Sequence, residues 1–338
     1  MMDGSNCTRV SDWRKAIRAT IVCGVLHLGG CHADHAQSML HPVSSASAEI
    51  AWLWWLLFGI CTTVFMIVML LLIAALWVPR SHDPRKVPLG SKFILIAGAV
   101  IPAVVLIFIL LASLRTQVAL AVPKARLTIE VIGHQWWWEV RYPDQQIVIA
   151  NEIYIPAGEP VRLELSSADV IHSLWVPNLN GKTDMLPDRV NVAWLSAYRP
   201  GKFRGQCAEY CGLQHAWMAL TVISLAHEEF EAWLEERRQP VAEPETAMQR
   251  RGREVFFQAA CNNCHSISGS HTARLRGPDL THVGSRHTLG AGLLPNNRES
   301  MAAWISDPQE HKPGNLMPRT VLGADDLQAL VEYLETLK

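Results

Sequence analysis

The sequence predicts a multidomain membrane protein with a two-helix transmembrane hairpin, an antiparallel β-sandwich or barrel, and a C-terminal all-α domain. Three observations predict this fold class. Two long uncharged apolar runs lie before residue 115, short β-type runs separated by turn signals follow from Arg126, and only helical patterns occur beyond residue 248. A chain of 338 residues is long enough for several such units.

Changes in composition along the chain suggest where these units begin and end. We expect a signal peptide at 1–30, an N-terminal segment with the hairpin at 31–121, a β domain at 122–238, a linker at 239–247 and a helical domain at 248–338. The charges are nearly balanced, with 30 basic and 31 acidic residues, so the composition predicts no nucleic-acid partner.

The N-terminus has the layout of a secretory signal. Early basic residues precede a short apolar run, Ala19–Leu28, which is too brief to span a bilayer. The run ends in Leu28-Gly29-Gly30-Cys31, which resembles a bacterial lipobox and predicts lipidation of Cys31. The alternative is a plain signal peptide that is cleaved near Ala36. In both cases Cys7 and Cys23 are removed.

Two stretches are long enough to cross a membrane. Ile50–Val78 and Phe93–Leu114 contain no charged residue, and each exceeds the ~20 residues that a spanning helix needs. We expect helices at about 50–78 and 93–115, with tryptophans near the ends of the first. The loop between them is basic, whereas residues 31–49 hold no Lys or Arg, so the loop should be cytoplasmic and both soluble domains extracytoplasmic. Cys61 lies inside the first helix, where a small apolar residue is expected.

The β domain shows short runs of strand-forming residues between turn signals. The predicted strands are Leu127–Ile132, Gln146–Ala150, Arg162–Ser166, Val170–Val176, Val192–Ser196 and Ala219–Leu225. An acidic helix, Glu228–Arg238, follows the last of them. In the helical domain, the terminal segment Asp325–Leu337 has apolar residues at helical spacing and should pack across the first helix of that domain.

The segment Cys207–Met218 carries most of the chemistry of the β domain. Cys207, Cys211, His215 and Met218 offer two thiolates, an imidazole and a thioether, which are soft ligands. A thioether favours copper, and His172 can supply a second imidazole. The cysteine and histidine spacing alone is also compatible with zinc or with a disulfide. No ligand position is left open for a substrate, which indicates electron transfer.

These residues resemble subunit II of haem–copper cytochrome c oxidases, whose copper loop is C-x-E-x-C-x3-H-x2-M. The resemblance spans roughly residues 45–235 and includes Asp169–Ser173, Lys182–Asp184 with Pro187 and Arg189, and Gly133–Trp138. It implies a cupredoxin-like β-barrel with a binuclear copper centre, CuA. The implied ligands are His172, Cys207, Cys211, His215, Met218 and, through its backbone carbonyl, Glu209. It also implies that the Glu209 side chain helps to hold Mg²⁺ at the boundary with subunit I.

The three tryptophans at Trp136, Trp137 and Trp138 have two interpretations. Alternation along a strand would place Trp136 and Trp138 on one face and Trp137 on the other, where they simply fill a core. The resemblance instead assigns Trp136 to the surface above CuA through which electrons arrive.

Cys261-Asn262-Asn263-Cys264-His265 is the C-x-x-C-H signature of covalent haem attachment, with His265 as an axial ligand. Zinc is the alternative, although no further cysteine is near. Met317 lies in a proline-rich loop that resembles the axial-methionine loop of class I cytochromes c. Met301 is the rival and should be a core residue. The histidines His271, His282, His287 and His311 are interpreted as ordinary surface or loop residues.

The resemblance therefore implies a terminal respiratory oxidase subunit II fused to its own cytochrome c domain. Electrons would pass from haem c to CuA and on to subunit I, where dioxygen is reduced to water with proton pumping. The implied partners are subunit I, which is obligatory, subunit III, and an upstream cytochrome or quinol–cytochrome c reductase complex. The implied location is the bacterial inner membrane, with the soluble domains on the periplasmic side. The linker would hold the donor at an effective concentration near ~1 mM.

Three other classes share parts of this pattern. A quinol oxidase subunit II has the anchor and barrel without copper ligands, and a nitrous-oxide-reducing enzyme needs a large catalytic domain. A copper chaperone uses fewer ligands and no haem. Copper and haem stoichiometry separates these alternatives.

Overall fold

The computed structural model describes residues 37–77, 90–267 and 276–338. These ranges all belong to one compact unit, Ala36–Lys338. The predicted signal peptide, the lipidation site Cys31 and the alternative cleavage site near Ala36 lie outside the described residues. His271 and most of the basic loop between the two apolar helices also lie outside them.

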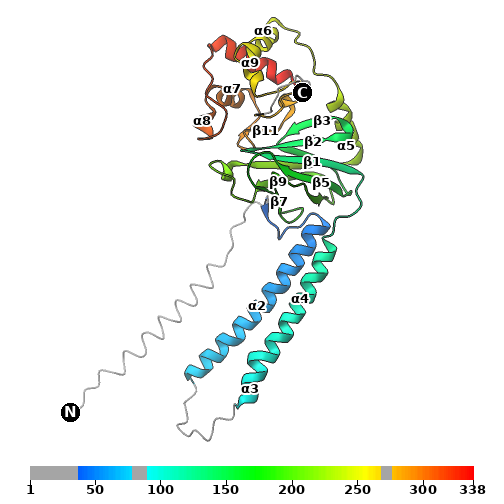
Figure 1. The fold of residues 1–338 in the computed structure, drawn as a ribbon, viewed down its shortest axis with the longest axis vertical. Helices are drawn as coiled ribbons and strands as arrows, with labels where there is room; N and C mark the ends of the chain where they lie inside the picture. The colour runs from blue at the N-terminus through cyan, green and yellow to red at the C-terminus, as the bar shows by residue number, and fades with distance from the viewer. Residues whose placement is uncertain (1–36, 78–89, 268–275) are drawn as a thin grey trace, which may run out of the picture. The chain divides into compact units, whose positions relative to one another are not determined.

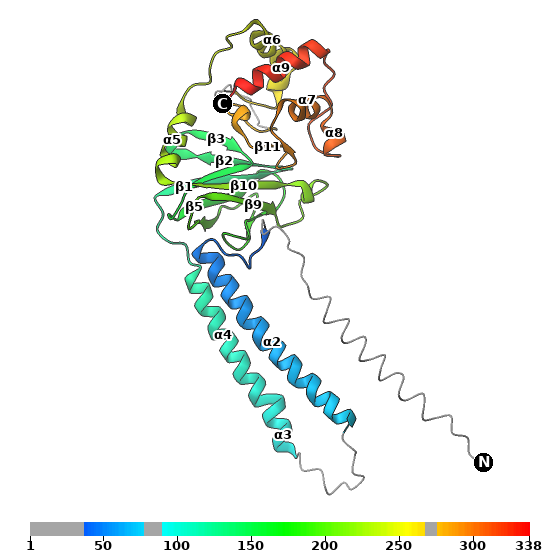
Figure 2. The ribbon, with the colours of Figure 1, turned by 180° about the vertical axis from the view of Figure 1, so that it is seen from behind.

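Two apolar helices form the hairpin that the sequence predicts. The first is α2 (Ser45–Trp77), and the second runs continuously through α3 (Ser91–Leu95), η3 (Ile96–Val100) and α4 (Ile101–Ala119). Figures 1 and 2 show the two side by side. An ion pair of 3.5 Å joins Arg115 to Glu49, and the Arg115 guanidinium lies 4.6 Å from the centre of the Trp52 ring. These contacts therefore join the two helices of the hairpin at the end nearest the β domain.

The second helix contains a π-helical turn, η3, directly before Pro102. Proline has no N–H, so the carbonyl of Gly98 lacks its usual donor four residues later. A local π-helical adjustment is one way in which apolar helices accommodate a proline. The helix continues through this point, as predicted.

The β domain is a sandwich of two five-stranded sheets. The first has the order β3-β2-β1-β5-β8 and the second has the order β4-β10-β9-β6-β7. The first sheet consists of β1 (Leu127–His134), β2 (Trp137–Tyr142), β3 (Ile147–Ala150), β5 (Val161–Ser167) and β8 (Asn191–Leu195). The second consists of β4 (Glu152–Pro156), β6 (His172–Trp175), β7 (Thr183–Met185), β9 (Gly201–Cys207) and β10 (Ala219–Leu225).

The predicted strands are present, but the prediction of a purely antiparallel domain was wrong. β1 pairs with β5 and β4 pairs with β10 in parallel. The strands β2, β4, β7 and β9 were not among the predicted ranges. β4 follows β3 after a single residue, Asn151, whose φ of 63° turns the chain, and β9 contains two glycines that weaken its strand pattern.

The core of the sandwich lies between the two sheets. Alternate residues of β1 and β5 point inward, and Ile129, Val131, Leu163 and Leu165 have no exposed surface. Helix α5 (His227–Arg238) covers one edge, where Trp233 stacks on Tyr154 with ring centres 4.3 Å apart. The packed sandwich therefore gives a rigid support for the loops at its ends.

The C-terminal domain is built around two crossing helices, α6 (Ala247–Gln258) and α9 (Ala324–Thr336). They touch at Gly252, where an added Cβ would lie 2.0 Å from the Ala329 carbonyl oxygen, so only glycine permits this approach. This confirms the predicted packing of the terminal helix. The remaining helices of the domain are η6 (Cys261–Asn263), η7 (Val283–Ser285), α7 (Arg298–Ser306) and α8 (Pro308–His311). A two-residue ladder, β11 (Thr288–Leu289) with β12 (Leu294–Pro295), is a small departure from the predicted all-α fold.

Candidate metal centre and haem site

Three neighbouring strands bring the candidate copper ligands to one end of the sandwich. In the second sheet β9 lies between β6 and β10. His172 begins β6, Cys207 ends β9, and Met218 comes directly before β10. The Cys207 N–H donates to the Met218 carbonyl at 3.0 Å, which closes the loop between them at its base. The loop itself contains Cys211 and His215, the latter in the short helix η5 (His215–Trp217).

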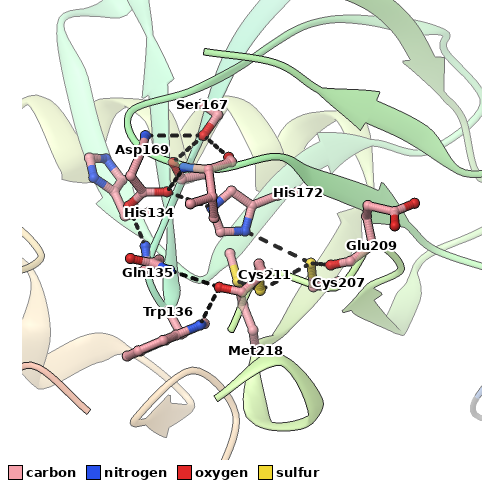
Figure 3. Close-up of polar contacts among 12 residues, drawn as sticks. His134, Gln135, Trp136, Ser167, Asp169, His172, Cys207, Glu209, Cys211 and Met218 are labelled. Atoms are coloured by element: carbon pink, nitrogen blue, oxygen red, sulfur yellow. Dashed lines mark hydrogen bonds and ion pairs between the residues drawn. The ribbon is translucent and has the colours of Figure 1, made fainter. Parts of the chain in front are cut away.

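The ligand atoms form a connected cluster, shown in part in Figure 3. The two sulfurs of Cys207 and Cys211 are 3.8 Å apart. His172 Nδ1 lies 3.9 Å from the Cys207 sulfur, and His215 Nδ1 lies 3.7 Å from the Cys211 sulfur. The thioether sulfur of Met218 lies 3.8 Å from the Cys211 sulfur. Each cysteine therefore has a histidine of its own, and the two cysteines lie between them.

This donor set fits soft metal ions. Ligands that hold one ion at ~2.0–2.3 Å in tetrahedral fashion are themselves roughly 3.3–3.8 Å apart, close to the separations found here. His172, Cys207 and Cys211 are all buried, and their ligand atoms lie within 4.8 Å of one another. Thiolate, imidazole and thioether ligands together select copper over harder cations. With two thiolates between two imidazoles, the cluster has donors for two ions.

The two thiols do not titrate independently. The two sulfurs share a hydrogen bond, and this bond lowers the pKa of Cys207 to about 3. The same hydrogen bond, together with burial, raises the pKa of Cys211. The pocket therefore stabilises one thiolate. Ionisation of the second thiol is unfavourable unless a cation compensates the added negative charge. Positive metal ions are the natural counterpart of such a pair.

Asp169 fixes the orientation of His172. Its carboxylate lies 2.8 Å from His172 Nε2, so Nε2 carries the proton and Nδ1 faces Cys207. The other carboxylate oxygen accepts a 2.7 Å bond from the Gln135 N–H. Gly133 makes room for the imidazole, since an added Cβ would lie 2.7 Å from its ring. The sequence motif contained Asp169, Gln135 and Gly133, but these supporting roles were not predicted.

Trp136 and Gln135 both hold the carbonyl of Cys211. Trp136 Nε1 donates to it at 3.0 Å and Gln135 Nε2 at 2.8 Å (Figure 3). Trp136 and Trp138 belong to the core of the sandwich, whereas Trp137 stacks on His134 with ring centres 4.3 Å apart. The predicted alternation of the three rings is confirmed. Trp136 is only 8% exposed, so its indole is not part of an open surface.

Glu209 is placed for two different uses. Its carbonyl oxygen lies 3.2 Å from the Cys207 sulfur, beside the ligand cluster. Its carboxylate points away, as Figure 3 shows, and pairs with Lys182 at 3.7 Å. The carbonyl can therefore serve the cluster while the carboxylate remains available outside it.

In the C-terminal domain, η6 carries Cys261, and Cys264 with His265 follows directly. His265 Nδ1 donates a hydrogen bond to the Pro278 carbonyl at 2.7 Å, so Nδ1 carries the proton and the lone pair of Nε2 is available to bind iron. Gly277 lies against the same ring, and an added Cβ would lie 2.5 Å from it. Burial lowers the pKa of His265, so the imidazole is neutral, as a metal ligand must be. These features fit covalent haem attachment.

The backbone of the Met317 loop is fixed by hydrogen bonds to the side chains of Gln309 and Asn315. Gln309 Nε2 donates to the Met317 carbonyl at 2.9 Å, and the Met317 N–H donates to Asn315 Oδ1 at 2.8 Å. Met301 is 3% exposed and packs in the core of the domain, as expected of it.

His282 and His287 were predicted as ordinary surface or loop residues, and both lie between helices and strands. His282 is a buried loop residue, 6% exposed, and its Nε2 donates to the Arg237 carbonyl at 3.1 Å. The backbone N–H of His287 donates to a Glu152 oxygen of the β domain at 2.6 Å. Both residues bring the helical domain into contact with the β domain. His311, predicted as a surface or loop residue, is half-buried and is the last residue of helix α8.

The fold and the two sites define a membrane protein with two soluble domains, one with a soft-ligand cluster and one of the cytochrome c type. Family models match both domains: "Cytochrome C oxidase subunit II, periplasmic domain" over residues 145–225 and "Cytochrome c" over residues 249–338. The "Cytochrome c oxidase subunit 2" of Alkalihalophilus pseudofirmus is 38% identical over 268 residues, covering 77% of this chain and 78% of that one. The chain therefore belongs to the cytochrome c oxidase subunit II family and carries a cytochrome c domain.

The chain is also similar to another subunit 2 and to one solved structure. The subunit 2 of Bacillus subtilis (strain 168) is 33% identical over 282 residues, covering 77% of this chain and 79% of that one. Among solved structures, the periplasmic domain of subunit II from Bradyrhizobium japonicum is 34% identical and covers 35% of this chain and 96% of that one, with a TM-score of 0.34. The chain is therefore a cytochrome c oxidase subunit with a subunit II periplasmic domain and a cytochrome c domain.

Proposed function

We propose that this chain passes electrons from a covalent haem c to a binuclear CuA centre and from there to subunit I, where dioxygen is reduced to water with proton pumping. The observation that carries the proposal is the cluster of two cysteine sulfurs, each with its own histidine at 3.7–3.9 Å. A site of this kind on a rigid sandwich suits electron transfer, because its ligands need not move when the charge changes.

In this proposal Cys207 and Cys211, together with His172 and His215, would hold two copper ions. Met218 and the Glu209 carbonyl would be further ligands. When bound, such a centre shares one electron between two metals. The chain contributes a fixed geometry: Asp169 orients His172, and Trp136 with Gln135 holds the loop through the Cys211 carbonyl. We further propose that electrons arrive through Trp136.

In the helical domain, we propose that Cys261 and Cys264 form the thioether links and that His265 and Met317 are the axial ligands. Methionine opposite histidine raises the potential of a haem, which suits a donor close to the end of a respiratory chain. The Pro278 carbonyl holds His265 in the ligating tautomer. The loop of Met317 is held by Gln309 and Asn315.

The boundary with subunit I is the third part of the proposal. The carboxylate of Glu209 would help to hold Mg²⁺ there, in exchange for its present partner Lys182. We also propose subunit III as a partner and an upstream cytochrome or quinol–cytochrome c reductase complex as donor. The proposed location is the bacterial inner membrane, with the soluble domains on the periplasmic side and a signal peptide, with lipidation at Cys31, before them.

Metal analysis and turnover test this proposal together. The purified oxidase should contain two copper ions and one haem c in this subunit and show a mixed-valence copper EPR signal. It should also turn over with a small reductant and no added soluble cytochrome c. A single exchangeable copper, or turnover that depends wholly on soluble cytochrome c, would contradict it.

A further inference from the structure

Beyond the two sites, the helical domain and the β domain share a buried polar interface. The most unusual member is Lys312, which is only 3% exposed. Its ammonium group donates to the Trp136 carbonyl of the β domain at 3.3 Å and to the Gly290 carbonyl of its own domain at 3.1 Å. No ion pair is found for it among the described residues.

A buried ammonium ion without a carboxylate partner is costly, because the loss of hydration is repaid only by hydrogen bonds. Burial lowers the pKa of Lys312 to about 8, which reflects this cost. The side chain is buried where the two domains meet, and one of its two acceptors belongs to the other domain. The hydrogen bonds of Lys312 therefore stabilise the contact between the two domains, and they do not serve the stability of either domain alone.

The two residues that follow Lys312 also contact the β domain. Gln214, which precedes the candidate ligand His215, donates through its side-chain amide to the Pro313 carbonyl. The Leu213 side chain lies next to Gly314, where an added Cβ would come within 3.1 Å of it. The proline-rich loop that carries Met317 thus packs directly on the loop that carries the copper ligands.

A second polar anchor lies on β4. Glu152 is 3% exposed, and its Oε1 accepts the 2.6 Å bond from the His287 N–H. Its Oε2 accepts a 2.9 Å bond from Tyr154 within the β domain. His282, which bonds to the Arg237 carbonyl, adds a third interdomain contact. The helical domain is therefore fixed at separated points and not merely tethered by the linker.

We infer that Lys312 and Glu152 lock the cytochrome domain in one pose on the β domain, and that Lys312 is a positioning residue for electron transfer into CuA. The inference rests on the proposed function. Lys312 contacts Trp136 through its carbonyl, and the indole of Trp136 bonds to the Cys211 carbonyl, so one short path joins the helical domain to the copper loop. The ring of Trp136 is itself 8% exposed and packs in the core of the sandwich.

The test is Lys312→Met in the complete oxidase, with Lys312→Arg as the conservative variant. Lys202→Met is the matched control, since Lys202 is an exposed lysine of β9. Two quantities are measured: the rate of electron transfer from haem c to copper after flash reduction, and hydrogen exchange of peptides that cover residues 211–217 and 311–316. The haem and copper spectra report whether both domains are folded and loaded.

We expect Lys312→Met to slow the transfer by about tenfold to a hundredfold, the scale of effect of an ångström-level misplacement. Hydrogen exchange should rise in both peptides, while the spectra stay unchanged. Lys312→Arg should recover most of the rate, and Lys202→Met should match the wild type. Wild-type rate and exchange in Lys312→Met would overturn the inference.

If Lys312→Met does not fold, Glu152→Ala tests the same interface from the β domain, and it should raise hydrogen exchange at 211–217 and 311–316. Unchanged exchange in that variant overturns the inference. A failure of the proposed function gives a different result: haem c and copper would not exchange electrons in the wild type, whatever the hydrogen exchange shows.

Discussion

Trp136 Nε1 lies 3.0 Å from the carbonyl oxygen of Cys211, so the ring proposed to receive electrons and a candidate copper ligand belong to one hydrogen-bonded unit. The neighbouring Gln135 shares the same acceptor at 2.8 Å. Trp136 and Gln135, which are not candidate copper ligands, therefore hold the loop between Cys207 and Met218 through one carbonyl. The consequences for electron transfer, metal binding and stability can be separated by substitution.

Trp136→Phe keeps an aromatic ring in the core but removes the donor to Cys211. Since Gln135 still holds that carbonyl, the free energy of unfolding should fall by only about 0.5–1.5 kcal/mol, the net contribution of one hydrogen bond. Electron transfer from haem c to copper should slow by at least about tenfold. Flash photolysis with thermal denaturation of the same sample checks both values. A large loss of stability with an unchanged rate would assign Trp136 to packing alone.

The cysteines and Met218 should differ in what they do to copper. Cys207→Ser or Cys211→Ser removes a thiolate ligand and should abolish the mixed-valence EPR signal. Met218→Leu has similar volume, and the two thiolates and two imidazoles remain, so two coppers should bind with an altered hyperfine pattern. EPR and copper analysis of the three variants decide this. Full retention of the signal in Cys211→Ser would exclude Cys211 as a copper ligand.

Met317 and Met301 provide a matched pair in the helical domain. Met317→Leu should leave the haem attached but remove its sixth ligand, lowering the potential and shifting the absorption spectrum. Met301→Leu repacks a core position and should cost less than about 1.5 kcal/mol with no spectral change. Visible spectroscopy and redox titration compare the two. A spectral change in Met301→Leu alone would reverse the ligand assignment.

Glu139 gives the β domain a defined pH dependence. Burial alone would raise the pKa of this carboxyl, but hydrogen bonds from His134 and Arg141 outweigh it and hold the pKa below its usual value. Because the folded-state pKa is lowered, the stabilisation is present above the unfolded-state pKa of about 4.3 and is lost as the pH falls below it.

Glu139→Gln should therefore reduce the free energy of unfolding at pH 7 by about 1.5–3 kcal/mol, the contribution of hydrogen bonds to a charged group. The difference from wild type should shrink as the pH falls below 4 or so. Tryptophan fluorescence during denaturation at several pH values measures it. A difference that is constant with pH would contradict the charged role of Glu139.

The two candidate sites could be predicted from sequence because their ligands are close together in the chain. Cys207, Cys211, His215 and Met218 lie in one loop, and Cys261, Cys264 and His265 in another. His172 lies far from them in the chain, and it was predicted because the site needed a second imidazole and the resemblance to a known motif includes it; β6 brings it beside Cys207. The hairpin and the terminal helix were predicted from apolar runs and helical spacing.

The supporting contacts could not be predicted in this way. The bonds from Trp136 to Cys211 and from Lys312 to Trp136 join residues far apart in the chain, and the bond from His172 to Asp169 spans only three residues, but no periodic pattern marks any of them. His282 was predicted as an ordinary surface or loop residue, and its burial against Arg237 at a contact between domains depends on chain segments that the sequence does not place together. The short strand β4 was missed because it follows β3 almost directly.

The central claim is that electrons reach copper through the chain's own haem. The most direct measurement is rapid mixing of the complete oxidase with a small reductant in the absence of soluble cytochrome c, with haem c and copper absorbance followed together. The same measurement is made on a variant without haem, Cys261→Ala with Cys264→Ala. We predict that haem c is reduced first, that copper follows, and that copper reduction is slowed by orders of magnitude in the haem-free variant. Copper reduction at the wild-type rate in that variant would contradict the account.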